Sequence, residues 1–167
     1  YIVQQYDLSD RIIIVTGGLG GGDTKGSNGD PYEMYKKLLL YCKELYFVQG
    51  DHDIYNHETE LLTNKNGNLC CLDRKIIQTT LGTIGGINGV IRKNKNKDLH
   101  KYTESEYIKA CNELLEDKPD IFVTHEAPRH YMFSPKLHIY GHTHDKLYFG
   151  RNFTDYINVN GRVIIVN

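Results

Sequence analysis

Residues 11–48 follow a strand–loop–helix–strand order, which limits the possible folds more than any other feature of the sequence. Residues 11–16 are a β-branched run typical of a buried strand. A loop with seven glycines occupies residues 17–30, and a proline then opens a helix expected over 31–44. A second apolar strand is expected at 45–48. This order is the signature of a βαβ crossover between parallel strands, so the sequence predicts an α/β fold.

Further strands and one further helix are predicted after this unit. Thr103 and Glu106 form a capping box, which opens a helix expected to end near Asp117. Residues 85–89 are interpreted as a turn, and Asn160-Gly161 as a hairpin turn. Strands are expected at 75–80, 81–84, 121–124, 137–140, 147–150, 156–159 and 162–166. Because we find no repeat or linker, residues 1–167 are predicted to form a single domain.

Four of the expected strands end in groups that could build one site. Those groups are Gly17-Gly18, Gly50-Asp51-His52-Asp53, His125 and Gly141-His142-Thr143-His144. The carboxyl ends of parallel strands lie along one edge of a sheet, so side chains that are distant in sequence can meet there. A carboxylate with several imidazoles is a ligand set for zinc or another divalent transition metal. Such a metal polarises a phosphoryl oxygen and activates a bound water molecule.

The order of these motifs resembles the calcineurin-like metallophosphoesterase family. Residues 16–20, Thr-Gly-Gly-Leu-Gly, are similar to the family's Thr-Gly-Asp-Leu-Gly, and the Gly-His-x-His pattern is present at the fourth strand end. The resemblance implies a four-layer α/β/β/α sandwich with metals at the strand ends. It also implies that Asp51, His125 and His142 ligate one metal and His144 the other. His52 would act on the leaving group as the catalytic acid or transition-state stabiliser, with Asp53 orienting its imidazole.

The sequence departs from the family pattern at several positions. No Asp-x-His motif precedes Arg11, and we expect residues 1–167 to lack the first strand of the family fold. Gly18 stands in place of the bridging Asp, and Asp51 in place of an Asn ligand. Asp23 could replace the bridging group only if the glycine loop folds back. We therefore expect one divalent metal ion (Mn, Zn or Fe), or two if residues preceding Tyr1 complete the second site.

Two functional hypotheses from different classes follow. The first is a metal-dependent phosphoesterase that hydrolyses a phosphate mono- or diester with metal-activated water. The second is a catalytically inactive pseudoenzyme that serves as a protein-binding scaffold subunit in a larger assembly. The retained histidines at positions 52, 125, 142 and 144 favour the first hypothesis, whereas Gly18 and Asp51 favour the second.

The composition of the chain indicates which kinds of partner and which cell compartment to expect. The formal net charge is −1, so no bulk electrostatic field favours nucleic acid or a membrane surface. The basic stretch at residues 92–101 is interpreted as a solvated loop, although contact with RNA is the alternative. No apolar run approaches the length of a membrane span. The four cysteines lack CxxC spacing, which predicts free thiols and an intracellular, cytoplasmic protein.

Overall fold

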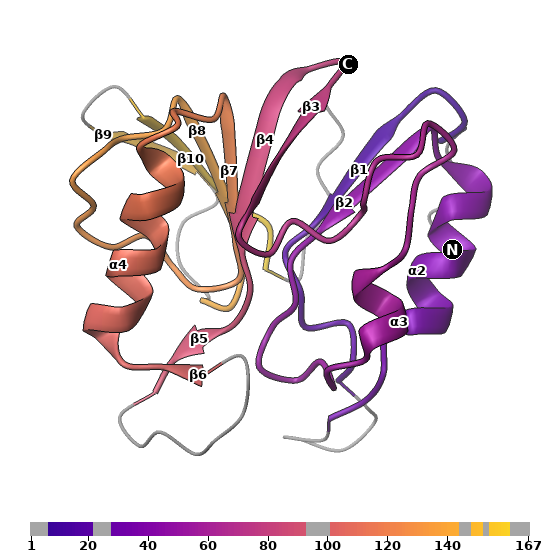
Figure 1. Cartoon of the computed structure of the whole chain (residues 1–167), viewed down its shortest axis with the longest axis horizontal. Helices are drawn as coiled ribbons and strands as arrows, with labels where there is room; N and C mark the ends of the chain where they lie inside the picture. The colour runs from indigo at the N-terminus through magenta and orange to yellow at the C-terminus, as the bar shows by residue number, and fades with distance from the viewer. Residues whose placement is uncertain (1–6, 22–27, 93–100, 144–147, 152–153, 161–167) are drawn as a thin grey trace.

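Two β-sheets pack face to face, and helices cover their outer faces (Figure 1). The computed structural model describes residues 7–21, 28–92, 101–143, 148–151 and 154–160. In chain order the elements are β1 (Ile12–Val15), α2 (Tyr32–Tyr41), β2 (Glu44–Phe47), α3 (His57–Glu60), β3 (Lys75–Thr79), β4 (Gly82–Ile87), β5 (Val90–Ile91), β6 (Lys101–Tyr102), α4 (Glu104–Leu115), β7 (Ile121–Thr124), β8 (Leu137–Tyr140), β9 (Tyr148–Arg151) and β10 (Thr154–Asn158). The small sheet has the order β1-β2 and the large sheet β3-β4-β7-β8-β10-β9, while β5 and β6 form a separate pair.

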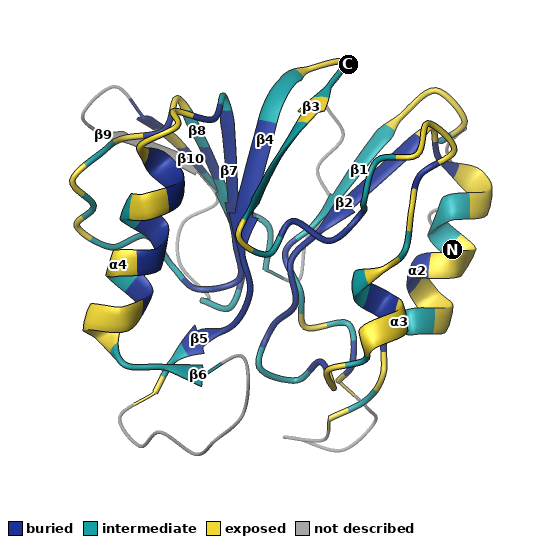
Figure 2. Cartoon of the chain, in the orientation of Figure 1, coloured by how far each residue is buried: buried dark blue, intermediate teal, exposed yellow. Residues whose placement is uncertain are grey.

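Three apolar clusters fill the interfaces between α2, the small sheet, the large sheet and α4. Ile13 and Val15 of β1 belong to the cluster that packs against α2. Their neighbours Ile12 and Ile14 belong to the cluster between the two sheets, because alternate side chains of a strand point to opposite faces. A third cluster joins α4 to β4 and β7. Figure 2 shows β2 and β7 buried inside this stack. The predicted α/β/β/α sandwich is confirmed.

The parallel strands place their carboxyl ends at the same end of the sandwich. β1 pairs with β2 in parallel, and β4, β7, β8 and β10 form a continuous parallel series in the large sheet. The antiparallel strands β3 and β9 lie at the two edges of that sheet. The loops that follow β2, β7 and β8 consequently meet, and these loops carry the motifs singled out in the sequence.

The helix predicted over residues 31–44 is shorter than expected, since α2 ends at Tyr41. Cys42 has an extended backbone with φ −108° and ψ 164°, and Glu44 begins β2. The buried Glu44 carboxylate accepts a hydrogen bond from the Tyr46 hydroxyl at 2.8 Å. This partner allows a charged residue to occupy the first position of β2, a position that the sequence pattern assigned to the end of the helix.

The turn predicted at residues 85–89 is wrong over its first part. Gly85 and Gly86 lie in β4, where Gly85 pairs with Phe122 of β7. A Cβ atom on Gly86 would lie 2.7 Å from Cγ1 of Val48, which belongs to the small-sheet side of the core. Glycine at this position therefore allows the two sheets to approach each other, a role that local sequence does not distinguish from a turn.

Some of the remaining secondary-structure predictions agree with the structure, and others do not. The capping box at Thr103 is present and begins α4. The strands expected at 147–150 and 156–159 are observed as the antiparallel pair β9 and β10, displaced by one or two residues, and β10 also pairs in parallel with β8. The short elements α3, β5 and β6 were not predicted. The strand expected at 162–166 and Gly161 of the hairpin turn lie outside the described residues.

Candidate metal centre

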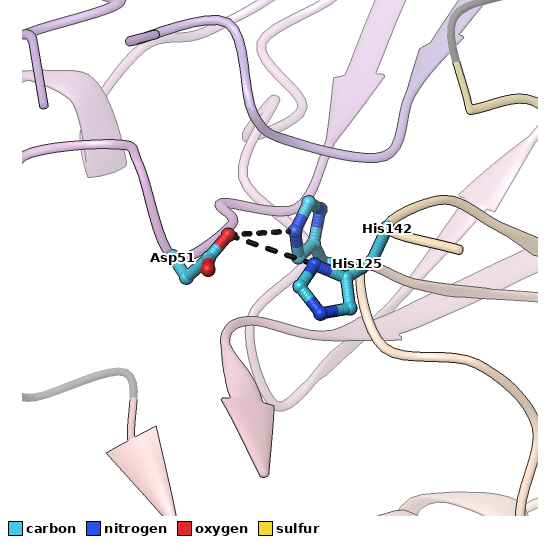
Figure 3. Close-up of side chains that lie close together, drawn as sticks. All are labelled: Asp51, His125 and His142. Carbon is cyan, nitrogen blue, oxygen red and sulfur yellow. Dashed lines mark hydrogen bonds and ion pairs between the residues drawn. The ribbon is translucent and has the colours of Figure 1, made fainter. Parts of the chain in front are cut away.

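Asp51, His125 and His142 bring three ligand atoms together at one end of the sandwich (Figure 3). One ligand atom from each residue lies within 4.8 Å of the other two. Asp51 lies in the turn after β2, His125 directly follows β7, and His142 is two positions beyond β8. One carboxylate with two imidazoles is a donor set that suits a divalent transition metal or zinc and leaves coordination positions open.

The Asp51 carboxylate is the negative centre of this group. Its side chain is only 4% exposed, and its Oδ1 atom lies 3.2 Å from Nε2 of His125 and 3.7 Å from Nδ1 of His142. Burial raises the pKa of Asp51, but the hydrogen bond from His125 and the attraction of the neighbouring imidazoles outweigh burial and hold that pKa well below its usual range. Burial lowers the pKa of His142, which favours the neutral form that binds metals.

The His125 ring is oriented by a backbone atom of the small sheet. Its Nδ1 atom lies 2.6 Å from the carbonyl oxygen of Thr16, at the end of β1. A carbonyl can only accept, so Nδ1 carries the proton that is donated. Nε2 faces Oδ1 of Asp51, to which it donates when it carries a proton, and it offers its lone pair to a metal when it does not. This is the arrangement in which a second hydrogen bond fixes both the tautomer and the orientation of a histidine ligand.

His142 has an uncommon backbone conformation for a residue with a Cβ atom, with φ of 65°. A hydrogen bond from the Thr143 amide to the Gly141 carbonyl, 2.8 Å long, closes the turn around it. The Asn158 side-chain amide donates to the Thr143 carbonyl at 2.9 Å and ties this turn to the end of β10. These contacts hold the His142 imidazole beside that of His125, with ring centroids 4.9 Å apart.

Gly50 and Gly18 leave the space that the His125 ring occupies. A Cβ atom on Gly50 would lie 2.6 Å from Cε1 of the ring, closer than real contacts allow, so a side chain at this position would displace the imidazole. A Cβ atom on Gly18 would lie 3.4 Å from the same carbon, and Gly18 has φ of 80°. Gly18 therefore borders the candidate centre, as expected for the position that resembles the bridging Asp, but it supplies no ligand.

Asp53 organises the backbone around the centre, and its expected orientation of His52 stays a prediction. Its carboxylate accepts hydrogen bonds from the amides of Gly18, Gly20 and Gly50, at 2.8, 2.6 and 2.7 Å respectively. The His52 imidazole lies near the Asp51 and Asn28 side chains.

His52 and Arg92 flank the second oxygen of Asp51. Nε2 of His52 lies 3.8 Å from Oδ2, and the imidazole is 40% exposed. The Arg92 guanidinium forms an ion pair with the same oxygen. The sequence interpretation missed Arg92 because it grouped this residue with a solvated basic stretch. Its place a few residues beyond the carboxyl end of β4 was the available signal.

Other residues singled out in the sequence lie elsewhere. His144, the proposed ligand of a second metal, and Asp23 are outside the described residues. His138 is fully buried in the large sheet and contacts the Thr124 hydroxyl, so it is a packing residue. The four cysteines are free thiols, as predicted, and all four are buried. Among the described helices, none is both long enough and apolar enough to cross a membrane.

The fold and the site together define an α/β sandwich protein with a candidate metal centre at its strand ends. The model of the calcineurin-like phosphoesterase family matches residues 7–146, and the chain belongs to this family. Membership confirms the resemblance noted in the sequence and implies metal dependence and phosphate-ester substrates. Searches of curated proteins and of solved structures returned no match.

Proposed function

We propose that this chain is a metal-dependent phosphoesterase that hydrolyses a phosphate mono- or diester with metal-activated water. The observation that carries the proposal is the convergence of Asp51, His125 and His142 in a chain of the calcineurin-like phosphoesterase family. The donor set fits a cation: one ionised carboxylate oxygen faces two imidazole nitrogens, and the Thr16 carbonyl already fixes the tautomer of His125.

The three residues would hold one divalent ion, Mn, Zn or Fe. When bound, such an ion would lower the pKa of its water ligand and polarise the phosphoryl oxygen. Asp51 contributes the charge that attracts the ion, and the neutral imidazoles of His125 and His142 complete its protein ligands. His144 would belong to a second metal site, for which Gly18 supplies no bridging carboxylate.

His52 would protonate the leaving-group oxygen. Its imidazole lies beside the candidate centre and is exposed on the side of Asp51 that faces away from the other two histidines. The Nδ1 atom lies 3.3 Å from the Asn28 side-chain oxygen, which can only accept and so holds Nδ1 as the donor. The imidazole is partly exposed beside the candidate centre, which is the position that a general acid acting on a bound ester needs.

Gly18 is the observation that favours a second candidate, an inactive phosphoesterase fold used as a scaffold subunit. It borders the His125 ring without a side chain, so the carboxylate that would join two metals is missing at that place. We also propose that residues 1–167 form one domain, supported by the core shared between the two sheets. An intracellular location is supported by the four buried free thiols.

Metal content and hydrolysis measured on the same preparations test the proposal. The wild-type chain, His125→Ala and His130→Ala would be loaded with manganese, desalted and analysed for metal, then assayed on 4-nitrophenyl phosphate and bis(4-nitrophenyl) phosphate. His130 is exposed and lies outside the three-residue cluster, so His130→Ala is the matched control. We expect about one manganese per chain and hydrolysis in the wild type and the control, and neither in His125→Ala. A wild-type chain that binds no metal would support the scaffold candidate instead.

A further inference from the structure

The two oxygens of the Asp51 carboxylate face different groups. Oδ1 is directed at the imidazoles of His125 and His142, which complete the candidate metal centre. Oδ2 is directed at the Arg92 guanidinium and at the imidazole of His52. The side chains of His125 and His142 are the more buried, whereas those of Arg92 and His52 are 44% and 40% exposed. A ligand entering from solvent would therefore meet Arg92 and His52 before it meets the metal-binding atoms.

The backbone of Arg92 is held in place by the large-sheet side of the molecule. The Ile91 amide donates to Oε2 of Glu126 at 3.0 Å, and the Arg92 amide donates to the Tyr102 carbonyl at 2.9 Å. Glu126 is buried and directly follows His125, so the same segment positions a candidate metal ligand and the base of the Arg92 side chain. A long side chain anchored in this way can change partners at its tip while its base stays fixed.

We propose that Arg92 binds the phosphoryl group of the substrate and selects phosphate monoesters over diesters. This inference rests on the proposed function and concerns the same site. The guanidinium is charged at every relevant pH and presents donors that match phosphate oxygens. When Asp51 ligates a cation, its charge is neutralised from the Oδ1 side, and the exposed guanidinium is available to the phosphoryl oxygens of a bound ester.

Charge balance favours a terminal phosphate as the substrate. A divalent cation against one carboxylate and two neutral imidazoles leaves a single positive charge, and Arg92 adds a second. A phosphate monoester carries about −1.5 to −2 charges at pH 7 and matches this balance. A diester carries one negative charge, so the removal of Arg92 should weaken the binding of a monoester more than that of a diester.

Three variants test the proposal on the full chain. Arg92→Met removes the charge, Arg92→Lys keeps a charge without the planar donors, and Arg11→Met removes an exposed arginine at the opposite end of β1. Each would be loaded with manganese and titrated with inorganic phosphate by calorimetry. Each would also be assayed for the ratio of kcat/KM on 4-nitrophenyl phosphate to kcat/KM on bis(4-nitrophenyl) phosphate.

We expect Arg92→Met to keep its manganese and to lose about 10- to 100-fold in phosphate affinity, because a hydrogen-bonded charge contact is removed. The monoester-to-diester ratio should fall with it, Arg92→Lys should be intermediate, and Arg11→Met should match the wild type. Unchanged phosphate affinity and ratio in Arg92→Met would overturn the inference and leave the proposed function standing.

Two other results separate the inference from the function on which it rests. Phosphate binding that depends on Arg92 in a manganese-loaded chain that hydrolyses neither ester would support the phosphate contact and contradict the proposed hydrolysis. Manganese uptake by Arg92→Met but not by the wild type would show that the guanidinium takes the place of the cation on Asp51, and this result would overturn the inference.

Discussion

The Thr16 carbonyl accepts the Nδ1 proton of His125 across 2.6 Å and so joins the end of β1 in the small sheet to the end of β7 in the large sheet. The candidate centre is therefore oriented by the packing of the two sheets, in addition to the loops that carry its side chains. Substitutions that alter this packing should change metal binding even where they touch no ligand.

Gly18→Asp should strengthen metal binding. The Cβ atom of the new side chain would lie 3.4 Å from Cε1 of His125, which places its carboxylate beside the candidate centre. We expect manganese affinity to rise about tenfold or more. The φ of 80° at this position should cost about 1 kcal/mol of stability for a residue with a Cβ atom. Gly18→Asn is the control, since it shares the backbone cost and lacks the charge. Equal manganese affinity in the two variants would contradict the placement of Gly18 at the bridging position.

Gly50→Ala should damage the centre by steric overlap alone. The added methyl group would lie 2.6 Å from Cε1 of His125, so either the ring or the backbone must move. We expect the free energy of unfolding to fall by about 1–3 kcal/mol and manganese affinity to drop. Gly21→Ala is the comparison, because a Cβ atom there would meet its nearest neighbour at 3.7 Å, an ordinary contact. Denaturant unfolding and calorimetry check the prediction, and Gly50→Ala with wild-type metal affinity would disprove the close contact.

Asp53→Asn should loosen the glycine loop. The carboxylate accepts three amide hydrogen bonds, from Gly18, Gly20 and Gly50, and an asparagine offers only one acceptor oxygen. We expect a loss of about 1–3 kcal/mol in unfolding free energy and faster hydrogen exchange at these amides. Asp117→Asn, an exposed aspartate beyond α4, should leave both quantities unchanged. Unaltered exchange rates in Asp53→Asn would argue against the three contacts.

His138 should make the fold sensitive to acid. The Thr124 hydroxyl donates its proton to the Glu126 carbonyl, so it can only accept from Nε2 of His138. Nδ1 of His138 has no hydrogen-bond partner among the described residues. Burial lowers the pKa of His138 from 6.5 to about 3. Between these values the unfolded chain binds a proton that the folded chain does not, so stability is full above pH 6.5 and falls as the pH drops toward 3.

His138 alone should lower the free energy of unfolding by about 1.4 kcal/mol for each pH unit of acidification, or by about 2 kcal/mol between pH 6.5 and pH 5. Urea unfolding at pH 7 and pH 5 measures this change in unfolding free energy. Metal-free protein is used so that pH-dependent metal binding by the ligand histidines does not contribute. His138→Gln retains a donor for Thr124 and does not titrate, so its loss of stability on acidification should be smaller by this amount. Parallel pH dependence in the two proteins would refute the assignment.

The sequence predicted the candidate ligands because their positions follow from strand order. Asp51, His125 and His142 each come just after a run that reads as a parallel strand, and parallel strands end together. Arg92 could not be found in this way. Its contact with Asp51 depends on the anchoring of the Ile91 amide by Glu126, a pairing between residues 35 positions apart that no local pattern encodes.

Glycine was the main source of error in the fold. Gly86 looks like a turn residue in sequence, yet it lies in a central strand because the neighbouring sheet needs the space. Asp53 shows the same limit, since its position beside His52 in the chain gave no sign of its three hydrogen bonds to the amides of Gly18, Gly20 and Gly50. Local sequence indicates which conformations are available, whereas packing partners decide which one is used.

The candidate ligands come from both sheets: Asp51 follows β2, whereas His125 and His142 follow β7 and β8. An ion held by all three would act as a reversible cross-link between the two halves of the sandwich and would close long loops of the unfolded chain. Chelators should then act as denaturants of moderate strength, because the binding free energy of the ion becomes part of the folding free energy. Hydrolysis and the stability of the fold would then depend on the same bound ion.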